Sequence, residues 1–274
     1  MPNSEIILIG GAGKTGGRIA ERLTRKDLNF RFASRSTARP FDWEKPAGWS
    51  ATLNGARSAY TSFQPDLVVS WAADAIGALA STAVDCGLTH IVLLSGRGEE
   101  GARRVEEALK ASGIGYTNQR ASWFCQNFSE GVFAEPIAAG ELALPAGAVK
   151  EPFIDAGDIA DAAVAALTDP RHIGKTYELT GPRALTFREA VAEIAAACGR
   201  NIAYRHISMA EFKERLHAAG LPNDMIDLLE ELFTQVLDGR NSLVGNGVAE
   251  MLGHPARDFT DYACDAAANG TWRI

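Results

Sequence analysis

Cysteine is scarce in this chain, and the spacing of its few copies does not suit a metal. Four cysteines occur in 274 residues, without a Cys-x-x-Cys or Cys/His ligand pattern. The sequence therefore predicts neither a disulfide framework nor a zinc site, and we expect no metal centre. The thiols lie in apolar helical patterns, where cysteine packs as a small hydrophobic side chain.

Long apolar runs and clusters of basic residues are missing as well. No run approaches the roughly 20 residues that a membrane-spanning helix needs, and no basic region with an apolar leader stands at the N-terminus. The formal net charge of −7 argues against nucleic acid as the main partner. We expect a cytoplasmic protein that acts on a small-molecule substrate, with no nucleic-acid or membrane partner. The sequence leaves its oligomeric state open.

The most informative feature that the sequence does contain is a glycine-rich stretch, residues 6–17. An apolar run typical of a buried parallel strand, Ile6–Ile9, is followed by a glycine turn and by a helical pattern from Arg18. Such a turn presents backbone N–H groups to a phosphate at the helix N-terminus, and glycine permits the close approach. The glycines fit Gly-x-Gly-x-x-Gly and Gly-x-x-Gly-x-x-Gly at once. We predict dinucleotide binding by Gly10, Gly11, Ala12, Gly13, Lys14, Thr15 and Gly16.

Two other interpretations of the turn are weaker. The glycines can serve the backbone turn alone, without a ligand. Gly13-Lys14-Thr15 also resembles the end of a P-loop, but that motif needs a glycine where Leu8 stands. Because Leu8 lies in the middle of the apolar strand, we do not expect a nucleoside triphosphate site.

Strand and helix signals alternate through the first half of the chain. This alternation predicts right-handed βαβ units and a doubly wound parallel sheet of the Rossmann type, an α/β fold whose ligands bind at the carboxyl ends of the strands. The expected strands are Ile6–Ile9, Phe30–Ala33, Ala59–Ser62, His90–Leu94 and Tyr116–Gln119, and the expected helices are Arg18–Arg25, Leu67–Cys86 and Glu99–Ala111.

The second half is richer in helices. Capping boxes at Thr186–Glu189 and Ser208–Glu211 start two of them. We predict a Rossmann dinucleotide-binding domain over residues 1–152 and a mostly helical substrate-binding lobe over residues 153–274, some segments of which return to the sheet. Further helices are expected at Ile159–Leu167, Asp224–Leu237 and Asp258–Ala268, and a further strand at Thr176–Leu179.

The end of the second expected strand indicates which dinucleotide binds. In this fold an acid at that position binds the ribose of NAD, and an arginine accommodates the 2′-phosphate of NADP. Here the strand runs into Ser34-Arg35-Ser36, with no acid, and a guanidinium with two hydroxyls suits a phosphate dianion. We predict NADPH rather than NADH, with Lys14 adding a second positive charge. A solvated turn is the other interpretation.

The Tyr-x-x-x-Lys pair of most short-chain dehydrogenases is absent, because no lysine stands four residues after any tyrosine. The helix that should carry the pair has glutamate and arginine at i,i+4 spacing, from Glu99 to Arg104. We expect a solvated, self-paired helix face there. Arg103 facing the cofactor is the alternative.

Two segments make the chain resemble a known family. Residues 10–16, Gly-Gly-Ala-Gly-Lys-Thr-Gly, resemble the glycine loop of the NmrA-like atypical short-chain dehydrogenases. Tyr116–Asn127 is similar to that family's Tyr-Thr-x-x-Arg-Pro-x-Trp-Phe-x-x-Asn segment, with Ala121 in place of the proline. Phe41-Asp-Trp43 followed by Trp49 resembles the branch that contains the ergot-alkaloid agroclavine and festuclavine dehydrogenases.

The resemblance implies a Rossmann domain, NADP(H) and hydride transfer to small organic substrates. It places Asp42 and Trp43 near the adenine, and Phe63, Pro65 and Ser95 near the ribose and nicotinamide. It also places Ser122, Trp123, Phe124 and Asn127 beside the nicotinamide and substrate, with Phe128 next to them. The aromatic residues can equally be core, Asn127 can bind a helix end, and Ser95 can cap a helix.

The missing tyrosine–lysine pair shapes the expected chemistry. We expect hydride transfer to a C=N, C=O or activated C=C bond, with the protein mainly orienting the reactants. The catalytic candidates are Ser95, Ser122 and Asn127. If the reaction needs a proton donor, the candidates for that role are Ser95, Ser122 and water. Two alternatives stand beside this oxidoreductase: an NADP(H)-binding redox sensor that catalyses nothing, as in some family members, and an interaction protein that binds neither cofactor form.

Overall fold

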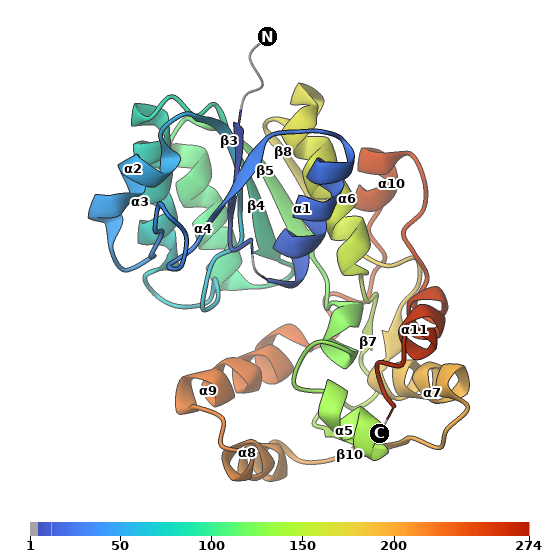
Figure 1. Cartoon of the computed structure of the whole chain (residues 1–274). Helices are drawn as coiled ribbons and strands as arrows, with labels where there is room; N and C mark the ends of the chain where they lie inside the picture. Colours follow the sequence, from blue (N-terminus) through green and yellow to red (C-terminus); the bar gives the residue numbers. More distant parts are fainter. Residues whose placement is uncertain (1–4, 12, 274) are drawn as a thin grey trace. The chain divides into compact units, whose positions relative to one another are not determined.

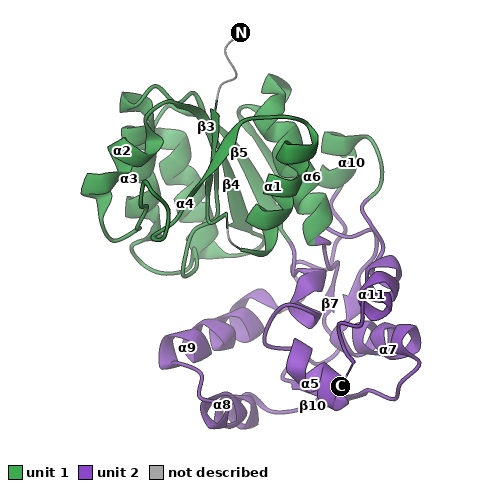
Figure 2. Ribbon diagram, in the orientation of Figure 1, with its two compact units in different colours: residues 1–121, 156–179, 246–255 green, residues 122–155, 180–245, 256–274 purple. Residues whose placement is uncertain are grey.

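The computed structural model describes residues 5–11 and 13–273. They form two compact units whose segments interleave along the chain, as the two colours of Figure 2 show. Unit 1 consists of residues 1–121, 156–179 and 246–255, and unit 2 of residues 122–155, 180–245 and 256–274. The sequence instead predicts one boundary, at residues 152/153, with later segments returning to the sheet. Residues 156–179 and 246–255 are segments of this returning kind, whereas residues 122–152, expected in the first domain, belong to unit 2.

Six strands, counted over the described residues, form the parallel sheet of unit 1, in the order β2-β1-β3-β4-β5-β8 (Figure 1). The α/β class expected from the alternating pattern is therefore confirmed. The strand β2 has its predicted bounds, and the other five strands extend beyond theirs by one to three residues at one or both ends, except that β3 ends one residue before Ser62. The strands are β1 (Glu5–Ile9), β2 (Phe30–Ala33), β3 (Ala56–Thr61), β4 (His90–Gly96), β5 (Gly115–Ala121) and β8 (Lys175–Leu179).

Helices of unit 1 cover both faces of this sheet. On one face α1 (Lys14–Arg25) packs against α6 (Ala156–Thr168), which also contacts α10 (Gly247–Leu252). On the other face α3 (Ala72–Asp85) packs against α4 (Glu100–Ala111), with α2 (Trp49–Leu53) beside α3. Inward-facing side chains of the strands, including Ile7 and Leu93, form a buried core with the second group. This is the layered arrangement of a doubly wound sheet.

Unit 2 is built on helices and two short strand pairs. The strand β6 (Glu141–Leu144) pairs in parallel with β10 (Ala203–His206), and β7 (Lys150–Glu151) pairs antiparallel with β9 (Leu185–Thr186). A π-helical turn, Leu232–Val236, continues from α9. The helices are α5 (Ala134–Ala139), α7 (Phe187–Cys198), α8 (Met209–Ala218), α9 (Asn223–Glu231) and α11 (Phe259–Ala268).

Aromatic rings fill the core of unit 2. Phe128, Phe153 and Phe187 are almost completely buried, and each ring lies within 6 Å of the other two. Trp272 joins them from the C-terminal segment: it is 1% exposed, and its Nε1 donates to the Phe128 carbonyl at 2.8 Å. An indole N–H buried in a core needs such an acceptor.

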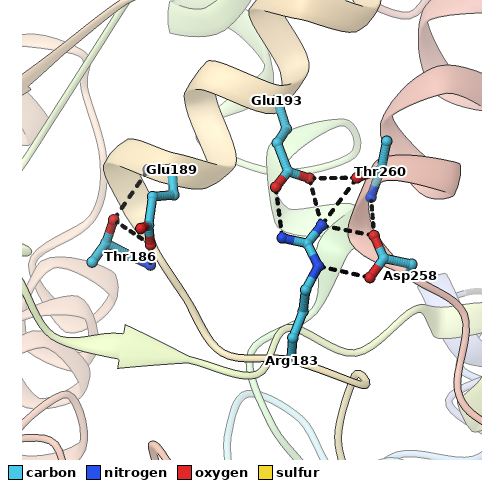
Figure 3. A network of polar contacts seen from close by, with 6 residues as sticks. All are labelled: Arg183, Thr186, Glu189, Glu193, Asp258 and Thr260. Atoms are coloured by element: carbon cyan, nitrogen blue, oxygen red, sulfur yellow. Dashed lines mark hydrogen bonds and ion pairs between the residues drawn. The ribbon is translucent and has the colours of Figure 1, made fainter.

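An arginine-centred cluster ties three segments of unit 2 together (Figure 3). The Arg183 guanidinium, in the loop before β9, donates to both carboxylate oxygens of Asp258 and of Glu193 at 2.7–2.8 Å. Beside it the capping box predicted at Thr186 is confirmed, because Thr186 and Glu189 satisfy each other's backbone N–H groups at the start of α7. At α8 the structure shows one half of the predicted box, the bond from the Glu211 N–H to Ser208.

A candidate dinucleotide-binding site

The glycine turn after β1 has the geometry that a phosphate needs. Gly10 has φ +83°, and a Cβ there would lie 2.8 Å from the Ser62 carbonyl oxygen. A Cβ on Gly16 would lie 2.4 Å from the Gly11 Cα, so the first turn of α1 packs directly on the loop. Only glycine fits at these two positions. Gly13 is the N-cap residue of α1, and within the described residues no side chain caps this end of the helix. The first turn of α1 also holds no acidic residue, so this helix N-terminus suits an anion.

The first helix begins four residues earlier than predicted. The sequence pattern starts at Arg18, whereas α1 starts at Lys14. Lys14, Thr15 and Gly16 therefore form its first turn, where backbone N–H groups point toward the loop. Gly10 and Gly13 are joined by a backbone hydrogen bond of 3.1 Å. Of the predicted loop residues, Ala12 lies outside the described residues.

A buried tyrosine, missed at the sequence level, holds this turn. Tyr60 on β3 is fully buried, and its hydroxyl donates to the Thr15 hydroxyl at 2.7 Å. Burial raises the pKa of Tyr60, so the phenol stays protonated and remains a donor. The available signal was a tyrosine inside a predicted strand, since a buried tyrosine hydroxyl usually has a hydrogen-bond partner.

The turn after β2 presents the predicted serine and arginine side chains. Ser34 Oγ lies 3.1 Å from Ser36 Oγ, and the Ser34 carbonyl accepts from the Thr37 hydroxyl at 2.9 Å. Arg35 and Ser36 are exposed. Nearby, the pKa of Asp42 is lowered, chiefly by the Glu44 backbone N–H and also by Lys45 and Arg35. Two hydroxyls and a guanidinium thus lie together on one exposed turn.

An aromatic cluster lies between the turns that follow β2 and β3. The rings of Trp43 and Phe63 are 4.6 Å apart, and each contacts a further tryptophan, Trp49 and Trp71 respectively. Trp49 Nε1 donates to the Asp42 carbonyl at 2.7 Å, which fixes this segment. Phe63 is followed by a cis peptide bond at Gln64–Pro65. Trp43, which the resemblance places near the adenine, and Phe63, which it places near the ribose and nicotinamide, are therefore neighbours.

Ser95, at the carboxyl end of β4, belongs to a buried polar network. Its hydroxyl donates to Glu106 of α4 at 2.5 Å, and Glu106 also accepts from Arg120 of β5. Sequence reasoning missed Glu106. The signal was present, because Ala102, Val105, Glu106 and Leu109 share one helix face and a carboxylate on an apolar stripe needs a partner.

Arg103 lies on the outer face of the same helix. Its side chain is 62% exposed and is 3.9 Å from the Glu100 carboxylate, an i,i+3 ion pair. The structure thus shows the solvated, self-paired face that the sequence favours, although the pairing is i,i+3 rather than i,i+4. A surface pair of this kind contributes little stability.

The predicted substrate residues lie in unit 2. Ser122 is buried and its hydroxyl donates to Glu151 at 3.0 Å, while Glu151 itself is fully buried. Trp123, Phe124 and Asn127 are half-buried, and the Trp123 ring packs on Phe187 and Phe233 of the aromatic core.

Phe128, in contrast, is a core residue. It has no exposed surface, and its ring is surrounded by those of Phe133, Phe153 and Phe259. Its carbonyl accepts from Trp272. The side chain therefore offers no surface to a substrate, and of the two interpretations open at the sequence level the core one describes Phe128.

The described residues contain neither a metal-binding cluster nor a membrane-spanning helix. Among residues 5–11 and 13–273, no group of three or more His, Cys, Asp or Glu side chains is placed to hold a metal ion. No helix in the same residues combines the length and the apolar character that crossing a membrane requires.

A parallel sheet whose first strand runs into a glycine loop defines the class of Rossmann-type nucleotide-binding folds. Within that class, the model of the NmrA-like family matches residues 102–243. The chain is 31% identical to agroclavine dehydrogenase of Claviceps fusiformis, over 95% of this chain and 96% of that one. It is 30% identical to NAD(P)H azoreductase of Xenophilus azovorans, over 97% and 99%. The chain belongs to the NmrA-like family.

Solved structures show the same fold at lower identity. An NADPH-dependent quinone oxidoreductase from Escherichia coli, in complex with NADPH, has a TM-score of 0.80 and 22% identity, over 95% of this chain and 99% of that one. The triphenylmethane reductase of Citrobacter sp. in complex with NADP(H) has a TM-score of 0.76 and 18% identity, over 96% and 99%. The architecture of this chain is thus one that reductases use.

Proposed function

We propose that this chain is an NADPH-dependent oxidoreductase that transfers hydride to a C=N, C=O or activated C=C bond of a small organic substrate. The observation that carries the proposal is the glycine loop at the uncapped, acid-free N-terminus of α1, together with the Ser34–Ser36 turn. The relatives that cover nearly the whole chain support it, since they are named as an azoreductase and an agroclavine dehydrogenase.

The cofactor side of the proposal lies in unit 1. Backbone N–H groups of residues 14–16 bind the pyrophosphate, and Lys14 adds a positive charge. Ser34, Arg35 and Ser36 bind the 2′-phosphate, because a guanidinium and two hydroxyls match its charge and its acceptor oxygens. The adenine lies against the Trp43 ring, where an aromatic face packs on a planar base, and Phe63 lies near the ribose.

The substrate side lies in unit 2. Trp123 and Phe124 offer half-buried aromatic surface, and Asn127 offers an amide that donates and accepts hydrogen bonds. Bound NADPH supplies the hydride. These side chains orient the substrate and exclude water, which is the main contribution expected of a site that lacks a tyrosine–lysine pair.

Two measurements test the proposal. Fluorescence titration of the purified chain with NADPH and NADH should give tighter binding of NADPH, and equal affinity would contradict the cofactor assignment. A screen of imines, quinones, enones and azo compounds should then show NADPH oxidation above background with at least one class. Binding of NADPH without turnover of any class would favour a sensor.

A further inference from the structure

The Ser95 hydroxyl points its proton into the protein. Ser95 is 3% exposed, and its Oγ donates to Glu106 Oε1 at 2.5 Å. The Glu106 side chain is 6% exposed, on the inner face of α4. A serine has one hydroxyl proton, so a serine that donates to a carboxylate inside the protein can only accept a hydrogen bond from a second partner.

A guanidinium keeps Glu106 in the accepting state. Arg120 Nε lies 2.9 and 3.1 Å from the two Glu106 oxygens, and Nη2 lies 2.6 Å from Oε2. The pKa of Arg120 is raised, with the hydrogen bond to Glu106 as the largest cause. A carboxylate held by two guanidinium nitrogens is ionised and carries no proton to pass to Ser95.

The network around Ser95 contains equal numbers of positive and negative side chains at the ends of three strands. Arg120 Nη1 lies 3.4 Å from Glu178 of β8, and Glu178 also pairs with Arg97, which follows β4. Two carboxylates and two guanidiniums therefore hold one another at the carboxyl ends of β4, β5 and β8. This is the edge where parallel sheets bind their ligands.

We propose that Ser95 is a positioning residue that accepts a hydrogen bond from an N–H or O–H group of the bound dinucleotide, and that it is not the proton donor of the reaction. Glu106 and Arg120 act through Ser95 by fixing the direction of its hydroxyl. The inference rests on the proposed function. The electrophilic carbon of a carbonyl substrate gains hydride, its oxygen becomes an alkoxide, and water protonates the alkoxide and leaves hydroxide. Ser95 neither gains nor loses a proton.

Two variants separate positioning from proton donation. Ser95→Ala removes the acceptor. Glu106→Gln reverses the hydroxyl, because an amide that keeps its oxygen toward Arg120 turns its NH2 toward Ser95. Glu107→Gln, an exposed neighbour on α4, is the control. For each variant we would measure the NADPH dissociation constant by fluorescence titration, kcat between pH 5 and 9, and the solvent isotope effect on kcat.

We expect Ser95→Ala and Glu106→Gln each to weaken NADPH binding about 3- to 10-fold, the loss of roughly one hydrogen bond. The pH profile of kcat and the solvent isotope effect should not change, and Glu107→Gln should match the wild type. A loss of about 10²- to 10⁴-fold in kcat for Ser95→Ala, with unchanged NADPH affinity, is the result of removing a general acid and would overturn the inference. Unchanged affinity and kcat would overturn it too.

Thermal unfolding shows whether each variant is folded. If Ser95→Ala does not fold, Glu106→Gln still tests the role of Ser95. Different results would contradict the proposed function and the role of Ser95. If the wild-type chain binds no NADPH, the proposed function fails and the inference fails with it. If the wild type binds NADPH and both variants bind it equally well, only the inference fails.

Discussion

The hydroxyl groups of Tyr60 and Thr15 meet at 2.7 Å in the interior of unit 1, and this contact joins the middle of the sheet to the first turn of α1. In this first turn of α1, Gly16 packs directly on Gly11, so the turn has little room to shift. The position of the helix N-terminus, and with it the proposed phosphate site, thus depends on a side chain from β3.

Tyr60→Phe should weaken NADPH binding and lower stability together. The variant leaves the buried Thr15 hydroxyl without its donor, which costs about 1 kcal/mol of unfolding free energy and loosens the first turn of α1. Urea unfolding and NADPH titration measure the two effects. Tyr116→Phe, at a half-buried position on β5, is the control and should change neither quantity. An unchanged NADPH affinity in a destabilised Tyr60→Phe protein would show that the contact serves the fold alone.

Arg35→Ala should change the choice of cofactor. A charge-assisted contact with a phosphate contributes about 1.5–3 kcal/mol, so NADPH affinity should fall about 10- to 100-fold while NADH affinity stays constant. Arg39, a nearby exposed arginine that donates to the Asn54 carbonyl, provides the control variant Arg39→Ala. If Arg35→Ala weakened NADPH binding and NADH binding equally, the result would contradict binding of the 2′-phosphate by the Ser34–Ser36 turn.

A buried histidine should make the fold sensitive to mild acid. His90 Nε2 lies 2.9 Å from the Thr117 hydroxyl, which itself donates to the His172 carbonyl, so His90 must be the donor. Burial, with a smaller effect of His172, lowers the pKa of His90 to about 4. The unfolded chain takes up this proton near pH 6.5 and the folded chain only near pH 4.

Stability should therefore fall as the pH drops from about 6.5 to about 4, by up to about 3 kcal/mol from this group. Urea unfolding at pH 7.5, 6.5, 5.5 and 4.5 measures the slope, and His90→Gln should flatten it. A slope that is the same in His90→Gln as in the wild type would assign the acid sensitivity to other groups. His217→Gln, at an exposed position on α8, is the matched control.

The Arg183 cluster should stabilise unit 2. Arg183→Ala removes five hydrogen bonds and leaves Glu193 and Asp258 close together without their cation. We expect a loss of about 1–3 kcal/mol of unfolding free energy. Arg183 lowers the pKa of Asp258 to about 2, so this contribution is complete above the usual pKa near 4 and is lost as the pH falls toward 2. Arg240→Ala breaks an exposed pair with Asp238 and should cost under about 0.5 kcal/mol. An equal effect of both variants in urea unfolding would contradict the prediction.

The elements that the sequence predicts well are those with a local signal. The strands of unit 1 follow from short apolar runs, and the glycine turn follows from its spacing. The start of α1 was misplaced because its first residues are Lys14, Thr15, Gly16 and Gly17, and glycine has a low helix propensity. Packing of Gly16 on Gly11 and the Tyr60 contact determine the helix start instead, and neither can be seen in local sequence.

The candidate site divides along the same line. Local motifs contain the glycines, Lys14 and Arg35, so the sequence predicts them. Glu106, in contrast, contacts Ser95 and Arg120, which are 11 and 14 residues away in the sequence. A periodic pattern shows that Glu106 lies on a buried helix face, but the choice of partner depends on which strands are neighbours in the sheet. Phe128 is similar, because only the packed structure shows that rings from four other segments enclose it.

The interleaving of the two units limits how this family can be recombined. The chain passes from one unit to the other after Ala121, Asp155, Leu179, Gly245 and Pro255. A single crossover between two relatives therefore always cuts through at least one unit and mixes core residues that were selected separately. A chimaera that exchanges the whole of unit 2 needs three grafts, over residues 122–155, 180–245 and 256–274. New substrate preferences should thus be easier to introduce into this chain by point substitution than by exchange of segments.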